Sequence, residues 1–261
     1  MPRFTANIAF LFPDLPFLDR IDAAKKVGFD MVECHFPYEH SIAELKARLD
    51  GAGVQMTGLN TVPGDKSIGE WGRAGMIGAE DQFRRDFEQA LSYAVALGVK
   101  GIHTMAANVT PETRAQALDL YKKNLAWGGR QAAGTGVKIL LEPLNSRDVP
   151  PYLVNTSDEI VRIVDEIGDP SVTLLFDAYH IQIMEGDLTK RFERHFDRIG
   201  HIQIAAVPSR AEPDEGEVDF RWFLKLVDDS AYDGLVGLEY KPRGDTAAGL
   251  KACLATLGTS L

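Results

Sequence analysis

Four polar residues stand at or near the ends of four apolar segments in the second half of this 261-residue chain. The segments are KILLE, TLLFD, HIQIA and VGLE, and their polar members are Glu142, Asp177, Gln203 and Glu239. Burying a carboxylate or an amide beside such runs is costly unless the group is paired or bound to a cation. Three carboxylates and one amide oxygen form a hard oxygen site, which suits Mg2+ or Mn2+ better than zinc. The alternative is that each acid pairs with an arginine or lysine of its own.

Histidines supply further candidates for chemistry. His103 in KGIHT and His180 in DAYH lie near the ends of predicted strands, and they would be the ligands of a zinc site, the less favoured metal. Glu33, in the segment FDMVEC, is a better candidate for a polar role in the pocket than the histidines that follow it. His195 is predicted to be solvated on a polar helix, and His201 is predicted to face the bottom of the fold.

Cationic and aromatic residues after the same segments could bind and enclose a substrate. Lys241 and Arg243 follow the last apolar segment in EYKPRG, and Arg210 follows the segment before it. A cation there could bind a substrate carboxylate, and an arginine could do so through two parallel hydrogen bonds. The alternative is an ordinary solvated loop charge. Trp71 and Tyr38 are predicted to wall the pocket.

Alternating strands and amphipathic helices must position these groups. Apolar residues such as Phe83, Phe87 and Leu91 recur at a spacing near 3.6, which is typical of a helix with one buried face. Strands are predicted at residues 5–10, 29–34, 54–60, 100–104, 137–142, 171–177, 201–205 and 235–239. Glycines predicted to follow helix ends in the left-handed conformation are Gly28, Gly53, Gly98, Gly136, Gly168, Gly200 and Gly234. A further helix start is predicted at residues 156–159, a typical cap sequence.

Eight such units fill residues 1–261 and predict a single-domain α/β fold, the (β/α)8 TIM barrel, with a doubly wound open sheet as the alternative. The long breaks at residues 60–80, 143–156 and 207–218 all follow predicted strands and precede predicted helices. A barrel places such loops at the carboxyl ends of its strands, where ligands bind. Neighbouring strands lie about 4.8 Å apart, so the four polar residues could face one cavity.

Composition excludes several other classes. The chain has 28 basic and 38 acidic residues, a net charge of −10, which argues against nucleic acid as a partner. No segment approaches the roughly 20 apolar residues of a membrane span, and the first apolar run is typical of a strand, so a cytoplasmic location is expected. Cys34 and Cys253 are expected to be reduced. No dinucleotide fingerprint, P-loop or nucleophile elbow is present.

Several ordered segments resemble the hydroxypyruvate isomerase family, which belongs to the xylose isomerase-like barrels. These segments are NxxPGDxxxGExG at 60–72, LEPLN at 141–145, FDAYHIQIMEGDLT at 176–189, HIQIA at 201–205, EPDEGEVDF at 212–220 and GLEYKPRG at 237–244. The resemblance runs nearly from end to end. It implies an isomerase, dependent on a divalent metal, that interconverts an aldose-like and a ketose-like form of a small 2-oxo acid.

The resemblance also implies roles for individual residues. The metal ligands would be Glu142, Asp177, Gln203 and Glu239. Glu142 and Glu239 would also be the catalytic pair that donates and accepts the proton, in an order that the sequence leaves open. The residues expected to bind the substrate are His180, Arg210, Lys241, Asn60 and His103.

The expected reaction converts hydroxypyruvate to 2-hydroxy-3-oxopropanoate by moving a proton from C3 to C2 through an enediolate. A divalent cation would stabilise the charge of that intermediate. Two features point to a neighbouring branch that isomerises 2-oxo-tetronate, one carbon longer: Ala206 stands where many relatives carry Asp, and NTVPGD…GEWG and IHTMA match that branch better. LEPLN…DVPPYLV matches the hydroxypyruvate branch better.

Three alternatives use the same scaffold. A ketose 3-epimerase would keep the same ligands and glutamates but return the proton to the carbon that lost it. A DNA-repair endonuclease would need several zinc-binding histidines and a basic groove, which the acidic composition disfavours. A sugar-acid sensor without catalysis would not need both glutamates. Barrels of this acidic type are often homo-oligomers, so a homo-oligomer is also an expectation.

Overall fold

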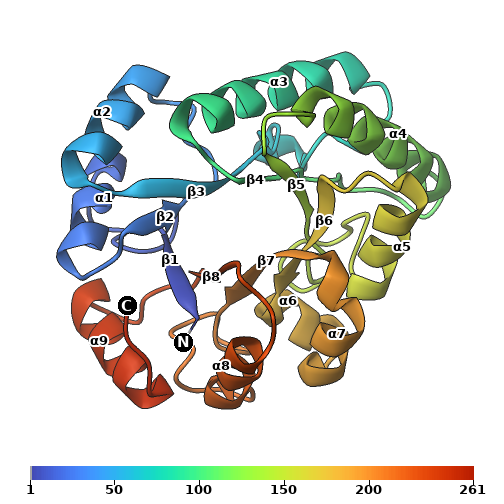
Figure 1. The fold of residues 1–261 in the computed structure, drawn as a ribbon. Coiled ribbons are helices and arrows are strands. Elements are labelled where there is room, and N and C mark those ends of the chain that lie inside the picture. The colour runs from blue at the N-terminus through green and yellow to red at the C-terminus, as the bar shows by residue number, and fades with distance from the viewer. Residues whose placement is uncertain (1) are drawn as a thin grey trace.

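The computed structural model describes residues 2–261 and forms a closed barrel of eight parallel strands (Figure 1). The strands are β1 (Arg3–Asn7), β2 (Met31–Glu33), β3 (Gln55–Asn60), β4 (Gly101–His103), β5 (Lys138–Leu141), β6 (Val172–Asp177), β7 (Ile199–Ile204) and β8 (Leu235–Leu238). Each strand pairs with the next in sequence, and β8 pairs with β1 to close the cylinder. The predicted (β/α)8 barrel is confirmed, and the open sheet is wrong.

Helices surround the barrel on all sides (Figure 1). They are α1 (Phe17–Lys26), α2 (Ile42–Ala52), α3 (Glu80–Leu97), α4 (Arg114–Ala132), α5 (Ser157–Ile167), α6 (Ala178–Met184), α7 (Leu188–His195), α8 (Phe220–Asp229) and α9 (Thr246–Leu257), with short 3-10 helices η1 (Lys66–Ile68) and η2 (Phe196–Arg198). Among the helices of residues 2–261, none combines the length and the apolar character that crossing a membrane requires.

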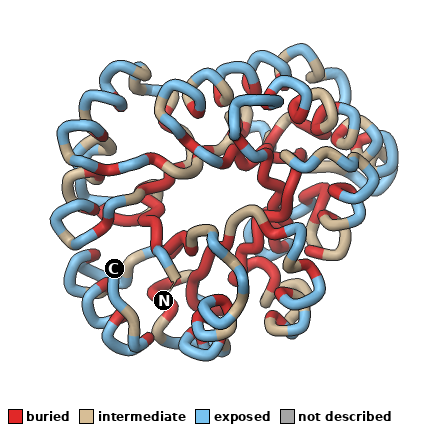
Figure 2. Tube along the Cα trace, in the orientation of Figure 1, coloured by how far each residue is buried: buried red, intermediate tan, exposed pale blue. Residues whose placement is uncertain are grey.

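The helices form where the sequence has apolar residues at helical spacing and a capping residue at the helix start. Phe83 and Phe87 are buried on the inner face of α3, as their spacing predicts. The predicted cap of α5 is confirmed, because the Thr156 hydroxyl accepts a hydrogen bond of 3.3 Å from the backbone N–H of Glu159. Figure 2 shows the result: the strands and the inner helix faces are buried, and the outer helix faces are exposed.

Gly28, Gly53, Gly98 and Gly168 have positive φ angles at helix ends, as predicted. Gly136 has a positive φ angle but lies four residues after the end of α4, and Gly200 and Gly234 do not have positive φ angles, so three of the seven predictions are wrong. Gly200 instead lies inside β7, which begins at residue 199 rather than 201. A Cβ atom there would lie 2.1 Å from Thr173 Oγ1 on β6, so close strand packing, not a turn, requires the glycine.

The long loops do follow strands. Residues 61–79 connect β3 to α3, residues 142–156 connect β5 to α5, and residues 205–219 connect β7 to α8. In a parallel barrel these segments all lie at the carboxyl-terminal mouth. Cys34 and Cys253 are buried and free, in agreement with the expected reduced thiols.

Candidate active site

A cavity of about 510 Å3 opens at the carboxyl-terminal mouth of the barrel. Seven of the residues singled out in the sequence line it: Glu142, Glu239, His180, Arg210, Lys241, Asn60 and His103. The other two, Asp177 and Gln203, are buried residues of β6 and β7 that contact the lining residues. The structure therefore brings to one region the nine residues expected to bind the metal, carry the proton or bind the substrate.

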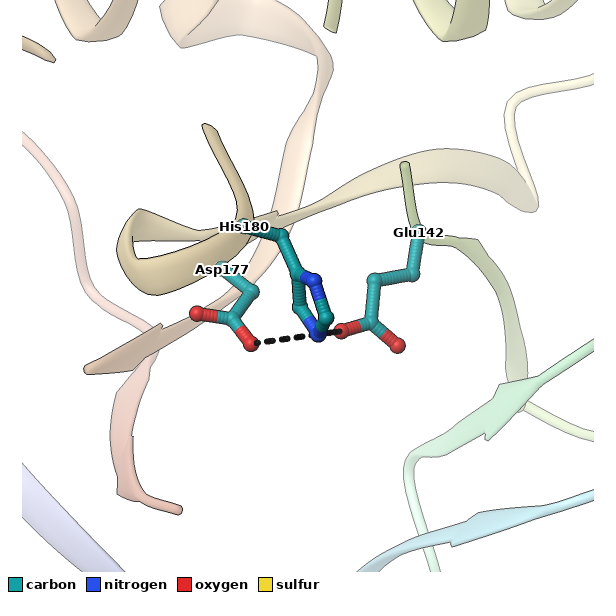
Figure 3. Close-up of side chains that lie close together, drawn as sticks. All are labelled: Glu142, Asp177 and His180. Carbon is teal, nitrogen blue, oxygen red and sulfur yellow. Dashed lines mark ion pairs between the residues drawn. The ribbon is translucent and has the colours of Figure 1, made fainter. Parts of the chain in front are cut away.

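Glu142, Asp177 and His180 form a buried cluster on one flank of this cavity (Figure 3). His180 Nε2 lies 3.6 Å from Glu142 Oε1 and 3.6 Å from Asp177 Oδ2. One ligand atom from each residue lies within 4.8 Å of the others, so this cluster could hold a metal ion. The backbone N–H of Asn145 donates to His180 Nδ1 at 2.9 Å, which places the proton of the neutral ring on Nε2, facing both carboxylates.

The two carboxyl groups of this cluster are poorly compensated. Burial raises the pKa of Glu142, and the negative charges of Glu239 and Asp177 raise it further. Burial and the charge of Glu239 likewise raise the pKa of Asp177. Their near neighbour His103, whose Nδ1 is 3.1 Å from Glu142, is buried, and this lowers its pKa to about 3. The carboxyl groups of Glu142 and Asp177 therefore have too little positive charge nearby to balance their own charges.

Glu239, on the other flank, has several donors. Arg210 Nη2 lies 2.8 Å from its Oε1, and Asn7 Nδ2 lies 2.9 Å from its Oε2, which also accepts from the Gln203 amide. His35 Nε2 lies 3.4 Å from Oε1. Burial alone would raise the pKa of Glu239, but His35 and Arg210 outweigh burial and lower it.

Glu33 extends this donor network into the barrel. Its Oε1 accepts from Asn7 at 3.1 Å and from Gln203 Nε2 at 2.7 Å, and its Oε2 lies 2.7 Å from His201 Nε2. His201 also borders a second cavity, of about 400 Å3, at the amino-terminal ends of the strands, in agreement with its predicted position. Glu33 does not itself line the mouth cavity, as the expected role in the pocket would require, but it connects to the site through Asn7 and Gln203.

The donor atoms fit a hard divalent cation. Gln203 Oε1 and Glu142 Oε1 are buried, yet neither has a hydrogen-bond partner within residues 2–261. A buried oxygen without a donor is costly unless a cation or water satisfies it. The alternative in which each acid pairs with its own arginine or lysine holds for Glu239 and is wrong for Glu142 and Asp177. In the described part of the chain, those two have only histidines within ion-pair distance.

Some residues near the site were not found from the sequence. Asn7 closes β1 as Asp177 closes β6, but the predicted strand ran to residue 10, and the apolar residues after Asn7 concealed the end of the strand. Lys66 and Arg147 line the cavity from long loops, where no periodic pattern indicates direction. Trp71 lines it as predicted.

Three sequence-based expectations are wrong. Arg243 does not line the cavity, because its guanidinium is held by Glu212, Asp214 and Glu215. Tyr38 does not line it either, and its hydroxyl donates to a backbone carbonyl. His195 was predicted to be solvated, but it is buried, and its ring lies 2.9 Å from the carboxylate of Asp158.

Comparisons with known proteins agree with this architecture. Residues 21–257 match the family model described as xylose isomerase-like TIM barrel. A 2-oxo-tetronate isomerase of Cupriavidus necator is 44% identical over 96% of each chain, and a hydroxypyruvate isomerase of Escherichia coli K12 is 35% identical over 96% of this chain and 98% of the other. A crystal structure of a protein named AP endonuclease, family 2, from Brucella melitensis superposes with a TM-score of 0.95 at 37% identity, covering 98% of both chains.

The closed barrel and the match over most of the chain define the class, a xylose isomerase-like TIM barrel. Within that class, the chain belongs to the family of hydroxypyruvate and 2-oxo-tetronate isomerases, and it is a sugar-acid isomerase. The family resemblance inferred from the sequence is confirmed.

Proposed function

We propose that the protein isomerises 2-oxo-tetronate, moving the carbonyl from C2 to C3. The 44% identity to a 2-oxo-tetronate isomerase, against 35% to a hydroxypyruvate isomerase, supports the longer acid over hydroxypyruvate, which sequence analysis placed first. The observation that carries the chemistry is the placement of two buried glutamates, Glu142 and Glu239, on separate walls of one cavity.

The reaction needs a proton to leave C3, a proton to arrive at C2, and the proton of the C3 hydroxyl to pass to the oxygen on C2. Glu142 follows β5 and Glu239 follows β8, three strands further around the barrel, so the two carboxyl groups can approach a bound substrate from different sides. His180 presents its Nε2 proton to the same space, where it can donate to a substrate oxygen. Arg210 holds Glu239 in position through its 2.8 Å hydrogen bond.

Glu142, Asp177, Gln203 and Glu239 would hold a divalent cation, with Mg2+ or Mn2+ favoured over zinc by the oxygen donors. Such a cation would stabilise the negative charge that develops on the enediolate oxygens. The unsatisfied oxygens of Glu142 and Gln203 support this assignment.

The carboxylate of the substrate needs its own cation. Arg210, a residue expected to supply it, is already engaged by Glu239 and lies 3.5 Å from Asp148. Lys66 and Lys241 also line the cavity, and within the described residues neither has a carboxylate at ion-pair distance. We therefore assign the substrate carboxylate to these two lysines, with Asn60 lining the same cavity.

Other functions find less support. A ketose 3-epimerase would use the same glutamates, but the lysine pair without carboxylate partners favours an acid over a neutral sugar. The Brucella melitensis protein is named an endonuclease, yet a net charge of −10 on this chain disfavours a nucleic-acid partner. A non-catalytic sensor would have no use for two buried glutamates in one cavity.

A substrate screen combined with proton exchange tests the proposal. We expect turnover of 2-oxo-tetronate to exceed that of hydroxypyruvate and free ketoses, with Mg2+ or Mn2+ present. Wild-type protein should exchange the substrate C–H proton into D2O, and Glu142→Gln and Glu239→Gln should each slow this exchange at least 100-fold. Exposed Glu88→Gln on α3 is the matched control. Exchange at the wild-type rate in both site variants would refute the assignment.

A further inference from the structure

Gln203 is an amide among carboxylates, and an amide can turn either its oxygen or its nitrogen toward a cation site. We propose that Glu33 and Asn7 are positioning residues that fix this choice, holding the Gln203 nitrogen inside the barrel so that its oxygen faces the cation. The inference rests on the proposed function, because it takes Gln203 as a ligand.

The hydrogen bonds of the Gln203 side chain define its orientation. Its Nε2 has two hydrogens, and two carboxylates accept from it: Glu33 Oε1 at 2.7 Å and Glu239 Oε2. The reversed amide would place its oxygen lone pairs against two carboxylate oxygens, with no donor between them. The observed orientation leaves Oε1 buried and without a partner in residues 2–261, the arrangement that a ligand oxygen needs.

Asn7 on β1 repeats the same bridge two strands further around the barrel from Gln203 on β7. Its Nδ2 donates to Glu33 Oε1 at 3.1 Å and to Glu239 Oε2 at 2.9 Å, while its Oδ1 accepts from the backbone N–H of Ala9. Two amides therefore connect two carboxylates in a closed ring of hydrogen bonds. Because every amide hydrogen of Asn7 and Gln203 is used, neither side chain can rotate without breaking this ring.

Two glycines, one on β8 and one on β3, leave space for the Glu33 side chain. Gly237 on β8 pairs with Gln203 on β7, and a Cβ atom on Gly237 would lie 2.5 Å from Glu33 Oε1 and 2.9 Å from Gln203 Cγ. A Cβ on Gly58 of β3 would lie 3.4 Å from Glu33 Cβ. A methyl group on Gly237 would thus crowd the contact between Glu33 and Gln203 without changing any charge.

Metal affinity of the metal-free protein, measured by calorimetric titration with Mn2+, tests the proposal without activity. Glu33→Met removes both acceptor oxygens, and we expect affinity to fall 10- to 100-fold, the usual effect of losing a group that orients a ligand. Glu33→Gln keeps one acceptor oxygen and should recover most of that loss. In a Gln203→Ala background, Glu33→Met should change affinity less than about threefold, since there is no amide left to orient. Glu88→Gln again serves as the control.

Each outcome has one meaning. Equal losses in Glu33→Met and Glu33→Gln, or an undiminished loss in the Gln203→Ala background, would mean that Glu33 acts only through its charge and would overturn the proposal. Wild-type affinity in Glu33→Met would overturn it as well. If Glu33→Met does not fold, Gly237→Ala replaces it and should weaken Mn2+ binding at constant charge, and wild-type affinity in Gly237→Ala would overturn the proposal. A wild-type protein that binds no Mn2+ would instead refute the cation site of the proposed function.

Discussion

Arg210 combines an unfavourable backbone conformation with a buried ion pair. Its φ angle is +56°, in the left-handed region that costs a non-glycine residue roughly 1–2 kcal/mol. The backbone is held there on both sides, because its N–H donates to the carbonyl of Ala206 at 2.7 Å and its carbonyl accepts from the N–H of Lys241 at 2.7 Å. The fold keeps this conformation because the side chain must reach Glu239.

Two substitutions separate the backbone from the side chain. Arg210→Ala and Arg210→Gly both remove the guanidinium, which lies 2.8 Å from Glu239 and within 5.1 Å of the rings of Phe10 and Tyr179. Removing one partner of a buried pair costs about 3–5 kcal/mol. Alanine keeps the left-handed strain and glycine relieves it, although glycine costs about 0.5–1 kcal/mol more backbone entropy on folding. We expect Arg210→Gly to be the more stable variant by about 0.5–1 kcal/mol.

Urea unfolding of the metal-free proteins measures both quantities. We expect both variants to lose several kcal/mol relative to wild type, with glycine above alanine. An alanine variant more stable than the glycine variant by about 0.5–1 kcal/mol, the backbone entropy that glycine loses on folding, would show that the φ angle carries no strain. A loss below about 1 kcal/mol in both would show that the pair with Glu239 does not stabilise the fold.

Three further predictions concern other parts of the molecule. Lys66→Ala should raise KM for the acid substrate about tenfold, or ~1.4 kcal/mol, with little change in kcat, whereas exposed Lys26→Ala should not, as steady-state kinetics will show. Gly72→Ala places a Cβ 2.6 Å from the Met105 backbone at φ +102°, so it should lower the free energy of unfolding by about 1–3 kcal/mol in urea titrations. Burial lowers the pKa of His195, so the unfolded state binds more protons than the folded state as the pH falls below about 6.5. The free energy of unfolding should therefore decrease between pH 7.5 and 5, and His195→Gln should make the measured decrease smaller.

The fold could be predicted because each strand and helix carries its own local pattern. Apolar runs that end in a polar residue identified Glu142, Asp177 and Glu239, and parallel strands bring such ends to one mouth whatever the helix lengths are. The same criterion misses Asn7, which ends β1 but is followed by the apolar residues 8–12. Gly200 was misplaced because a glycine that permits strand packing looks the same in sequence as one that ends a helix.

Side-chain direction in loops and partners across the fold could not be predicted. Arg243 lies only four residues beyond Glu239, yet it turns away from the cavity because three acidic residues of another loop hold it. His195 looked solvated because its own helix is polar, but an aspartate of α5 covers it. In each case the deciding partner is distant in sequence, so no local period indicates it.

The acids of the mouth fall into two groups that differ in their donors, and this division supports the proposed cation site. Glu239 and Glu33 share the amides of Asn7 and Gln203, and Glu239 also has Arg210. Within residues 2–261, Glu142 and Asp177 have as ion-pair neighbours only histidines whose pKa burial lowers, so those rings are neutral and cannot balance them. In the network that satisfies Glu239, Gln203 donates through its nitrogen, so its oxygen is left without a hydrogen-bond partner in residues 2–261. A divalent cation would supply the charge that Glu142 and Asp177 lack and the partner that this oxygen lacks.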